Sequence, residues 1–368
     1  MTAIIDHLRS FATGALPRSH AMPGSFYTDP ALLEIEKEKL FRGEWICLGH
    51  EDEVKHPGDY FATDLVGEPL LVLRNGAGDV KVFSNVCRHR GNIVAEGRGR
   101  RNLHVCAYHA WSYDRDGRLA RAPLMDQVPA FKAGDCSLPP IRTAIWQKFI
   151  FVNLDGKAAP LAERLAPLEP LVRNYHNETR HLYVQREEVW ATNWKCLSEN
   201  FMEGYHLDAT HPQTLKPVTP TGLCDYVAGN GWFTAYRAHY TPEAEQRRPF
   251  HPDLTPEEQR YSCLFSVLPA FVVTYMPHLT VYLCLRPVDV DHVAIRWGIA
   301  GHAESLPPET LAAHVKFADD FNAEDRVKLE TLQRGLKSRF YKPGPLAAQD
   351  YEGTIRDFYD YMARMLTA

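Results

Sequence analysis

Several features common in other protein classes are absent from this sequence. Neither charge sign is in large excess: 41 Lys and Arg residues stand against 46 Asp and Glu residues, a net charge of −5. No basic block is present, which argues against partnership with nucleic acid or an anionic membrane surface. Internal repeats and low-complexity tracts are also missing, and 45% hydrophobic residues in a chain of 368 exclude a disordered protein. At about 100–200 residues per domain, we expect two domains.

A long uninterrupted apolar run is missing as well. The most apolar stretch, 264–285, contains Pro269, Pro277 and His278, and it predicts two buried strands rather than a membrane span. The first 21 residues do not follow a secretory pattern, so we expect a cytoplasmic protein. Eight cysteines in such a chain predict free thiols, and any cysteines at ligand spacing then indicate metal or redox chemistry.

The order of apolar and turn residues predicts an α+β protein in three parts. A helix expected over 26–44, opened by Asp29 and Pro30, belongs to an N-terminal segment, 1–41. Short β-type runs separated by Asn-Gly and Asp-Gly turns predict a small antiparallel β domain, 42–156. Longer elements predict a further domain, 157–368, with helices packed on an antiparallel sheet. The elements expected there are helices near 193–207 and 307–336 and strands around 228–239, 262–275, 279–286 and 292–301.

Two cysteine–histidine pairs lie in the expected β domain. His89 follows Cys87 by two residues, and His109 follows Cys106 by three. Two thiolates and two imidazoles can make a tetrahedral zinc site, or they can hold a Rieske [2Fe–2S] cluster with the cysteines on one iron and the histidines on the other. Zinc ribbons more often present C-x-x-C knuckles, so C-x-H paired with C-x-x-H favours the cluster.

A second group of ligand-type residues lies in the expected helix near 193–207. Asn200, Glu203 and His206 recur every three residues, which would place them on one helix face. His211 directly precedes Pro212, so the helix must end or bend before it, and the bend could bring His211 to the same metal as His206. Two histidines and one carboxylate would complete a facial triad for non-haem iron.

The carboxylate is predicted from the periodicity of the helix expected over 307–336. Asp325 lies within its apolar stripe, and a buried carboxylate needs a partner, which a metal or a core Arg or Lys could provide. The stripe consists of Leu311, Val315, Ala318, Leu329, Leu332 and Leu336. Four other carboxylates fall off it: Asp319, Asp320, Glu324 and Glu330.

Together the two groups resemble the Rieske non-haem iron oxygenases, specifically their large (α) subunit, over nearly the whole chain. The resemblance implies that the two cysteine–histidine pairs hold the [2Fe–2S] cluster. It also implies that His206, His211 and Asp325 hold Fe(II) in a catalytic domain of the helix-grip type, and that the N-terminal segment packs on that domain. The chain departs from the usual family pattern at Ala107 and Ala110, where most members have Pro and Gly.

Glu203 carries a further implication of the resemblance. A family carboxylate at this position bridges a Rieske histidine of one subunit to an iron-ligating histidine of the next, which implies a homotrimer. Most members have Asp there, and Glu resembles the branch that oxidises carnitine, glycine betaine and stachydrine. A solvated glutamate without this role is the alternative. Asn200 is expected either to hydrogen-bond near the iron or to pack within the helix.

The chain also lacks a G-x-G-x-x-G fingerprint and any sign of a flavin domain. We therefore expect NAD(P)H and flavin to act only through a separate partner, a reductase or a ferredoxin. The predicted function is a mono- or dioxygenase that hydroxylates or N-demethylates a small quaternary amine; hydroxylation of an aromatic ring or acid, and electron transfer without oxygenase chemistry, are the alternatives. Aromatic residues that could contact a cation or simply fill the core are Phe201, Tyr205, Trp232, Phe233, Tyr236, Phe265, Phe271, Tyr275 and Tyr282.

Overall fold

The computed structural model describes residues 2–14, 19–244 and 250–367. The chain divides into two compact units, 41–158 and 1–40 together with 159–368. The fold class is the predicted one, a small antiparallel β unit and a larger unit in which helices pack on an antiparallel sheet. Among the described helices, none is both long and apolar enough to cross a bilayer.

The unit 41–158 is built from three small antiparallel sheets. Asn75 shows why the chain turns where the sequence predicts, because its side-chain oxygen accepts hydrogen bonds from the amides of Ala77 and Asp79. The first sheet has the order β1 (Ile46–His50), β10 (Phe149–Asn153), β9 (Arg142–Trp146). The second has the order β4 (Val80–Ser84), β3 (Glu68–Arg74), β2 (Asp59–Leu65), β5 (Arg98–Arg100). The third contains β6 (His104–Val105), β7 (Ser112–Tyr113) and β8 (Leu119–Arg121).

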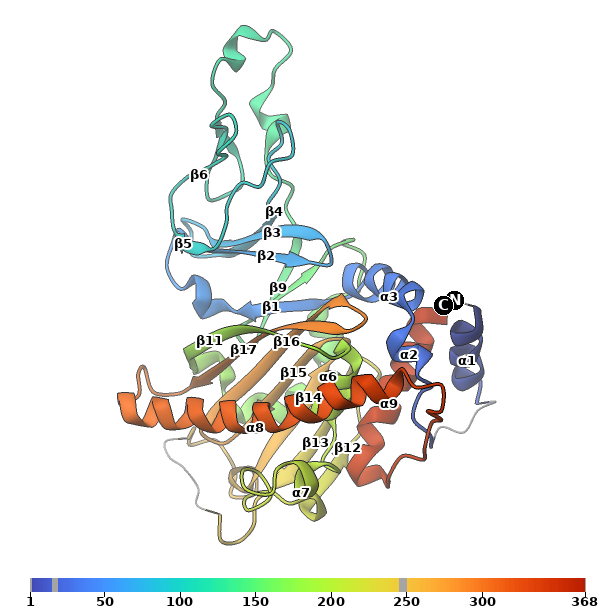
Figure 1. Ribbon diagram of the computed structural model, residues 1–368. Coiled ribbons are helices and arrows are strands. Elements are labelled where there is room, and N and C mark those ends of the chain that lie inside the picture. The colour runs from blue at the N-terminus through green and yellow to red at the C-terminus, as the bar shows by residue number, and fades with distance from the viewer. Residues whose placement is uncertain (1, 15–18, 245–249, 368) are drawn as a thin grey trace. The chain divides into compact units, whose positions relative to one another are not determined.

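The other unit contains one antiparallel sheet of seven strands (Figure 1). Their spatial order is β11 (His181–Trp190), β17 (His292–Gly301), β16 (Leu279–Asp289), β15 (Phe271–Tyr275), β14 (Tyr261–Val267), β13 (Phe233–His239), β12 (Cys224–Val227). The single strand expected over 262–275 is two strands, β14 and β15, joined by a turn at Pro269, which has no amide hydrogen for the ladder. The edge strand β11, whose exposed middle is charged, was not predicted from the sequence.

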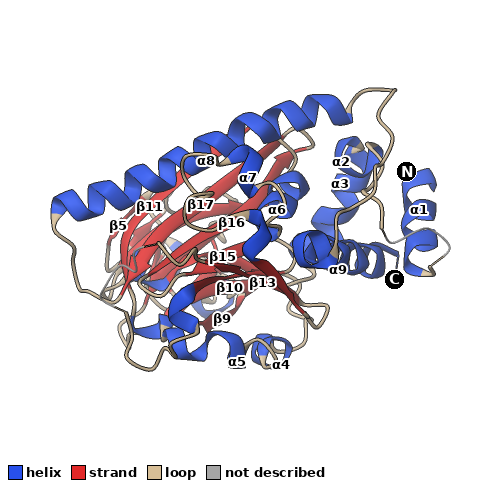
Figure 2. Cartoon of the chain, turned by 90° about the horizontal axis from the view of Figure 1, so that it is seen from below, coloured by secondary structure: helices blue, strands red, loops and turns tan. Residues whose placement is uncertain are grey.

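Helices pack on this sheet and position the candidate ligands (Figures 1 and 2). The longest, α8 (Pro308–Leu336), lies across the face of the sheet on which α6 (Trp194–Met202) and the short α7 (Leu207–Thr210) also pack. A further helix, α9 (Gln349–Thr367), was not predicted from the sequence; it packs on β12, β13 and α6, and α1 (Thr2–Ala12) packs against it. Two short helices, α4 (Leu161–Leu165) and α5 (Glu169–Val172), precede β11.

The helix expected over 26–44 is a chain of shorter pieces: α2 (Ser25–Thr28), α3 (Pro30–Glu36) and a π-helical turn, Lys37–Arg42. As predicted, the side chain of Asp29 caps α3 by accepting a hydrogen bond from the amide of Ala31 at 2.8 Å. The last residue of α3, Glu36, is fully buried and forms an ion pair with Lys195 of α6 at 2.6 Å. The N-terminal segment is thereby joined to the helix that precedes the candidate iron site.

The expected helix near 193–207 is wrong in its second half. Asn193 caps α6 as its side chain accepts from the amide of Lys195, but the helix ends at Met202. Glu203 is extended (φ −129°, ψ 156°), and its carboxylate accepts the amide hydrogens of Tyr205 and His206. The predicted common helix face of Asn200, Glu203 and His206 is therefore absent. The reason is that Glu203 caps the turn that leads from the end of α6 to α7.

The apolar stripe predicted for α8 matches the buried face of the helix at most of its positions, with a difference in the last turns. Ala318, Asp325, Leu329 and Leu336 are buried, as the periodicity predicts. Leu332, by contrast, is 45% exposed, and Gln333 is buried in its place. Gln333 is polar but satisfied, since its side chain accepts from the amide of Asn193 and donates to the carbonyl of Val290.

Candidate metal centres and substrate cavity

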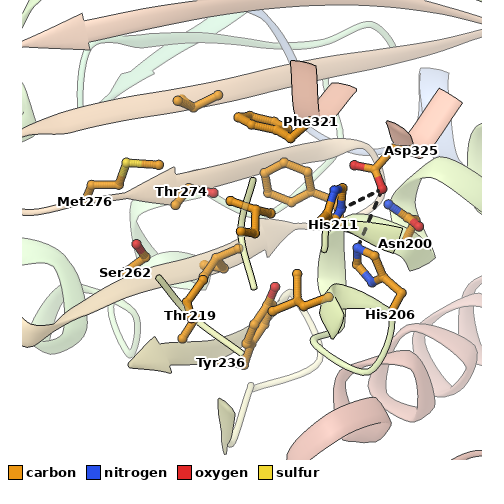
Figure 3. Close-up of a pocket in the computed structure, with 16 residues that line it drawn as sticks. Asn200, His206, His211, Thr219, Tyr236, Ser262, Thr274, Met276, Phe321 and Asp325 are labelled. Atoms are coloured by element: carbon orange, nitrogen blue, oxygen red, sulfur yellow. Dashed lines mark ion pairs between the residues drawn. The ribbon is translucent and has the colours of Figure 1, made fainter. Parts of the chain in front are cut away.

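His206, His211 and Asp325 converge on one point between α6, α7 and α8 (Figure 3). The Asp325 Oδ1 atom lies 3.0 Å from His211 Nε2 and 3.6 Å from His206 Nε2. His211 is fully buried, and both His211 Nε2 and Asp325 Oδ1 lack a hydrogen-bond partner. Unpartnered buried nitrogen and oxygen atoms that face each other are costly unless an ion joins them. Two imidazoles and one carboxylate are a fitting donor set for non-haem iron.

Each of the two imidazoles is oriented by a glutamate. Glu203 Oε1 lies 2.6 Å from His206 Nδ1, and Glu324 Oε2 lies 2.8 Å from His211 Nδ1. Because an ionised carboxylate only accepts hydrogen bonds, both Nδ1 atoms carry the hydrogen and both Nε2 lone pairs face Asp325. Burial alone would lower the pKa of His206, but the Glu203 and Asp325 carboxylates raise it overall.

Sequence reasoning missed Glu324, which it placed off the buried stripe. The residue flanks Asp325 on α8, from where its carboxylate reaches His211 and also accepts the hydroxyl hydrogen of Thr214 at 2.6 Å. The only available signal was its position directly before a predicted ligand. Periodicity separates buried from exposed faces and does not show what the flank of a helix touches.

A cavity of about 80 Å³ opens from the three converging side chains. Its walls include Asn200 from α6, Tyr236 from β13 and Phe321 from α8 (Figure 3). Phe201 of α6 also lines it. A second chamber of about 250 Å³ adjoins it. The residues that line both are Leu215, Thr219, Ser262, Met276, Val281 and Phe321.

Only two of the nine aromatic candidates line this cavity, Phe201 and Tyr236. The hydroxyl of Tyr236 donates to the carbonyl of Glu203 at 3.2 Å, which orients the ring. Tyr205 is 57% exposed. The other six, Trp232, Phe233, Phe265, Phe271, Tyr275 and Tyr282, do not line either chamber. Asp325 is the sole carboxylate among the lining residues of both chambers, and Thr219 adds a buried hydroxyl without a hydrogen-bond partner.

The two cysteine–histidine loops of unit 41–158 have the same backbone hydrogen bonds. The carbonyl of Cys87 accepts from the amide of Gly91, and that of Cys106 accepts from the amide of Ala110, both at 3.0 Å. Gly91 and Ala110 both have positive φ, 77° and 57°. Ala110 thus occupies a left-handed position that normally favours glycine. The loop keeps its shape despite the side chain.

The four ligand-type residues are divided by exposure. Cys87 and Cys106 are 3% and 2% exposed, whereas the side chains of His89 and His109 are exposed, with ring centroids 4.6 Å apart. Within the described residues, a set of three or more ligand atoms within 4.8 Å of one another occurs at two places, and these loops are not among them. Donor atoms this far apart suit a two-iron cluster better than a single zinc ion. In such a cluster the buried thiolates would hold one iron and the exposed imidazoles the other.

Hydrogen-bond donors surround the cysteine sulfurs. The Tyr113 hydroxyl oxygen accepts from the amide of Arg88 at 2.9 Å, so its hydrogen is directed to the Cys87 sulfur, 3.3 Å away. Burial raises the pKa of the Cys106 thiol, but hydrogen bonds, foremost from the amide of Tyr108, lower it overall. Donors of this kind stabilise thiolate ligands.

Comparison with known proteins agrees with this geometry. The family model "Ring hydroxylating alpha subunit (catalytic domain)" matches residues 169–368, and "Rieske [2Fe-2S] domain" matches residues 44–132. The carnitine monooxygenase oxygenase subunit of Escherichia coli (strain K12) is 28% identical over 94% of this chain and 93% of its own length. The glycine betaine monooxygenase oxygenase subunit of Pseudomonas aeruginosa (strain UCBPP-PA14) is 28% identical over 99% of this chain and 92% of its own.

Solved structures show the same fold. The quaternary ammonium Rieske monooxygenase CntA, in complex with an inhibitor, superimposes with a TM-score of 0.85 and 26% identity, covering 97% of this chain and 98% of that one. Naphthalene 1,2-dioxygenase from Rhodococcus sp. superimposes with a TM-score of 0.81 over 100% of this chain and 98% of that one, but at 18% identity it shows the fold alone. Because the catalytic-domain model matches more than half of the residues and the cluster-domain model matches the remaining metal-binding loops, the chain belongs to the Rieske non-haem iron oxygenases, as an oxygenase α subunit.

Proposed function

We propose that the protein uses O₂ and electrons from a separate reductase or ferredoxin to hydroxylate or N-demethylate a small quaternary amine. In this proposal Cys87, His89, Cys106 and His109 hold the [2Fe–2S] cluster. His206, His211 and Asp325 hold the mononuclear iron. The observation that carries the proposal is the convergence of these three side chains at the wall of an aromatic-lined cavity. When bound, the iron supplies O₂ activation and the cluster supplies single electrons.

The protein's own residues prepare the site for that chemistry. Glu203 and Glu324 keep the Nδ1 hydrogens of the two histidines in place, which leaves both Nε2 atoms free to bind metal. The full burial of His211 excludes water from one side of the ligand set. Three protein ligands leave positions open for O₂ beside the substrate.

Glu203 is also proposed to mediate electron transfer between the two metal centres as a bridging carboxylate. Its side chain is 10% exposed and already contacts His206, so one end of the suggested bridge is in place. The other end would be a Rieske histidine of a neighbouring subunit in a homotrimer. His89 and His109 are exposed and therefore open to such a partner. The cytoplasmic location predicted from the sequence stays a prediction.

The cavity suits a cation held by ring faces rather than by a carboxylate. Phe201, Tyr236 and Phe321 line it, and its one carboxylate, Asp325, is committed to the metal in this proposal. A cation over an aromatic face gains about 0.5–2 kcal/mol, with the larger value when it is desolvated. The similarity to carnitine and glycine betaine monooxygenase subunits over nearly the whole chain supports this substrate class.

Oxidation of an aromatic ring or acid is the second candidate. The apolar character of the cavity favours it, because Leu207, Leu215 and Leu264 line the cavity together with the rings and would accept a flat apolar substrate equally well. Electron transfer without oxygenase chemistry is not proposed, because the chain carries the catalytic domain of the family in addition to the cluster domain.

Oxygen consumption separates the two candidates. We expect purified protein with a generic reductase to consume O₂ when a betaine-type amine is added, and to release formaldehyde if an N-methyl group is attacked. The Asp325→Ala variant should lose turnover while it keeps the visible spectrum of the cluster. Turnover of an aromatic acid without turnover of any quaternary amine would reverse the assignment, and turnover by Asp325→Ala would refute the ligand set.

A further inference from the structure

A second group of histidines and a carboxylate gathers on the catalytic unit and shares no residue with the cavity. His176 lies between the 3₁₀ turns Arg173–Tyr175 and Asn177–Thr179, directly before β11, and His251 and Asp253 lie in the connection between β13 and β14. One ligand atom from each residue lies within 4.8 Å of the other two. The proposed iron chemistry uses none of the three.

Asp253 stands at the centre of this group. Its Oδ2 atom is 2.9 Å from His176 Nε2 and 3.8 Å from His251 Nδ1. The two imidazole rings are stacked, with centroids 3.9 Å apart and planes 29° apart. The imidazole side chains are 30% and 24% exposed and that of Asp253 is 61% exposed, so an ion can reach the group from solvent. The three donors therefore surround a point that is accessible.

The hydrogen bonds orient both imidazoles toward that point. His176 Nδ1 lies 2.8 Å from Glu178 Oε1, and His176 Nε2 lies 2.9 Å from Asp253 Oδ2, so a carboxylate accepts from each ring nitrogen. A metal ion bound here would replace the hydrogen on Nε2, while Glu178 keeps the hydrogen on Nδ1. A histidine held by a second carboxylate in this way is the usual arrangement around metal ligands. The Nδ1 atom of His251 accepts a long hydrogen bond, 3.3 Å, from the amide of Asp253, so it carries a lone pair, and a metal ion bound here would displace that weak hydrogen bond.

The neighbouring His302 has a different role. The Thr179 hydroxyl donates its hydrogen to the carbonyl of His176. In the contact of 3.1 Å between Thr179 and His302, the donor is therefore His302 Nδ1 and the acceptor is the Thr179 oxygen. Arg180 Nε donates to His302 Nε2 at 3.2 Å. Both ring nitrogens of His302 are occupied, and burial, together with Arg180, lowers its pKa to about 3. His302 is therefore a neutral neighbour of His251 and is not a fourth ligand.

We infer that His176, His251 and Asp253 form a binding site for a divalent transition-metal ion, for which Zn²⁺ is a suitable probe. Two neutral imidazoles and one carboxylate are a common zinc donor set, with the remaining positions taken by water. Glu178 is the outer partner of the first ligand. An ion here would join the connection between β13 and β14 to the turn before β11. The inference does not depend on the identity of the oxygenase substrate.

Zinc uptake by iron-loaded, full-length protein tests the inference. After equilibrium dialysis against zinc sulfate, we expect about one zinc per chain in the wild type. Uptake should be weaker by at least about tenfold in His176→Ala and His251→Ala, because even outer partners of metal ligands are worth about 10–100-fold in affinity. Glu178→Gln should fall between the wild type and these variants. Zinc should also raise the melting temperature of the wild type and not that of the two variants.

His292→Ala is the matched control. His292 is also paired with an aspartate, since its Nδ1 atom lies 2.9 Å from Asp289. Among the described residues, however, this pair belongs to neither group of three converging metal-ligand atoms. Zinc uptake by His292→Ala should equal that of the wild type. If His176→Ala fails to fold, His251→Gln and Asp253→Asn provide the same comparison. Equal zinc uptake by wild type and His251→Ala, or equal loss in His292→Ala, would overturn the inference.

Discussion

Glu324 offers a sharp test of how His211, a proposed iron ligand, is held in place. Its Oε2 atom accepts hydrogen bonds from His211 Nδ1 at 2.8 Å and from the Thr214 hydroxyl at 2.6 Å. Because His211 is fully buried, Glu324→Ala leaves its Nδ1 hydrogen without the carboxylate that accepts it. Such a loss costs about 1–3 kcal/mol. Loss of an outer partner of a metal ligand lowers metal affinity by about 10–100-fold, which corresponds to about 1.4–2.8 kcal/mol, so the two estimates agree.

The assay is iron retention against increasing chelator, with the visible spectrum of the Rieske cluster as an internal measure of folding. We expect Glu324→Ala to release iron at about 10–100-fold lower chelator concentration than the wild type. Glu324→Gln should fall between them because its amide oxygen still accepts the hydrogen bond. Thr214→Val is the control, since it removes the other donor and leaves the His211 contact intact. Wild-type iron retention by Glu324→Ala would refute the reasoning.

Three further predictions concern stability. Ala110→Gly should stabilise cluster-containing protein against urea by about 0.5–1 kcal/mol, because relief of the strain at this left-handed position exceeds the gain in entropy of the unfolded chain. Loss of visible absorbance at a lower urea concentration than in the wild type would contradict this prediction. Lys195→Met should lower the free energy of unfolding by about 3–5 kcal/mol, because the buried Glu36 loses its cation and keeps only the hydrogen bond from Trp194. Adding Glu36→Gln to Lys195→Met should recover most of this loss, and equal losses would exclude the ion pair as the cause. Burial raises the pKa of Glu199 to about 8, so the folded state keeps a proton that the unfolded state loses above about pH 4. The wild type should therefore lose stability relative to Glu199→Gln between about pH 4 and 8 and show a constant difference above that range; a constant difference throughout, in urea titrations, would contradict the shifted pKa.

The parts of the site that sequence could predict are those set by spacing and periodicity. The two histidines before Pro212 and the carboxylate within the stripe of α8 come together in the structure, since the helix period placed Asp325 correctly on the buried face. Local hydrogen bonds explain the failures. The amides of Tyr205 and His206 are taken up by Glu203, which ends α6 earlier than its apolar spacing suggests.

The residues around the ligands depend on tertiary structure, which spacing does not encode. Strand register decides which aromatic residues reach the cavity: Tyr236 on β13 lines it, whereas Phe265 on β14 is buried elsewhere. Glu324 is recognisable only once α8 is placed beside the turn that carries His211. The edge strand β11 was missed because its charged middle pairs with β17 on one side and faces outward on the other.

The catalytic unit is discontinuous in sequence, and this sets an order for its biosynthesis. Residues 1–40 pack with 159–368, while 41–158 form a separate compact unit inserted between them. A ribosome therefore releases the complete cluster-binding unit while α9, the partner of α1, is still unmade. Since compact units can fold as they emerge, the two cysteine–histidine loops can take their shape before His206, His211 and Asp325 are brought together. The unit proposed to carry electrons would thus be able to fold before the unit proposed to activate oxygen.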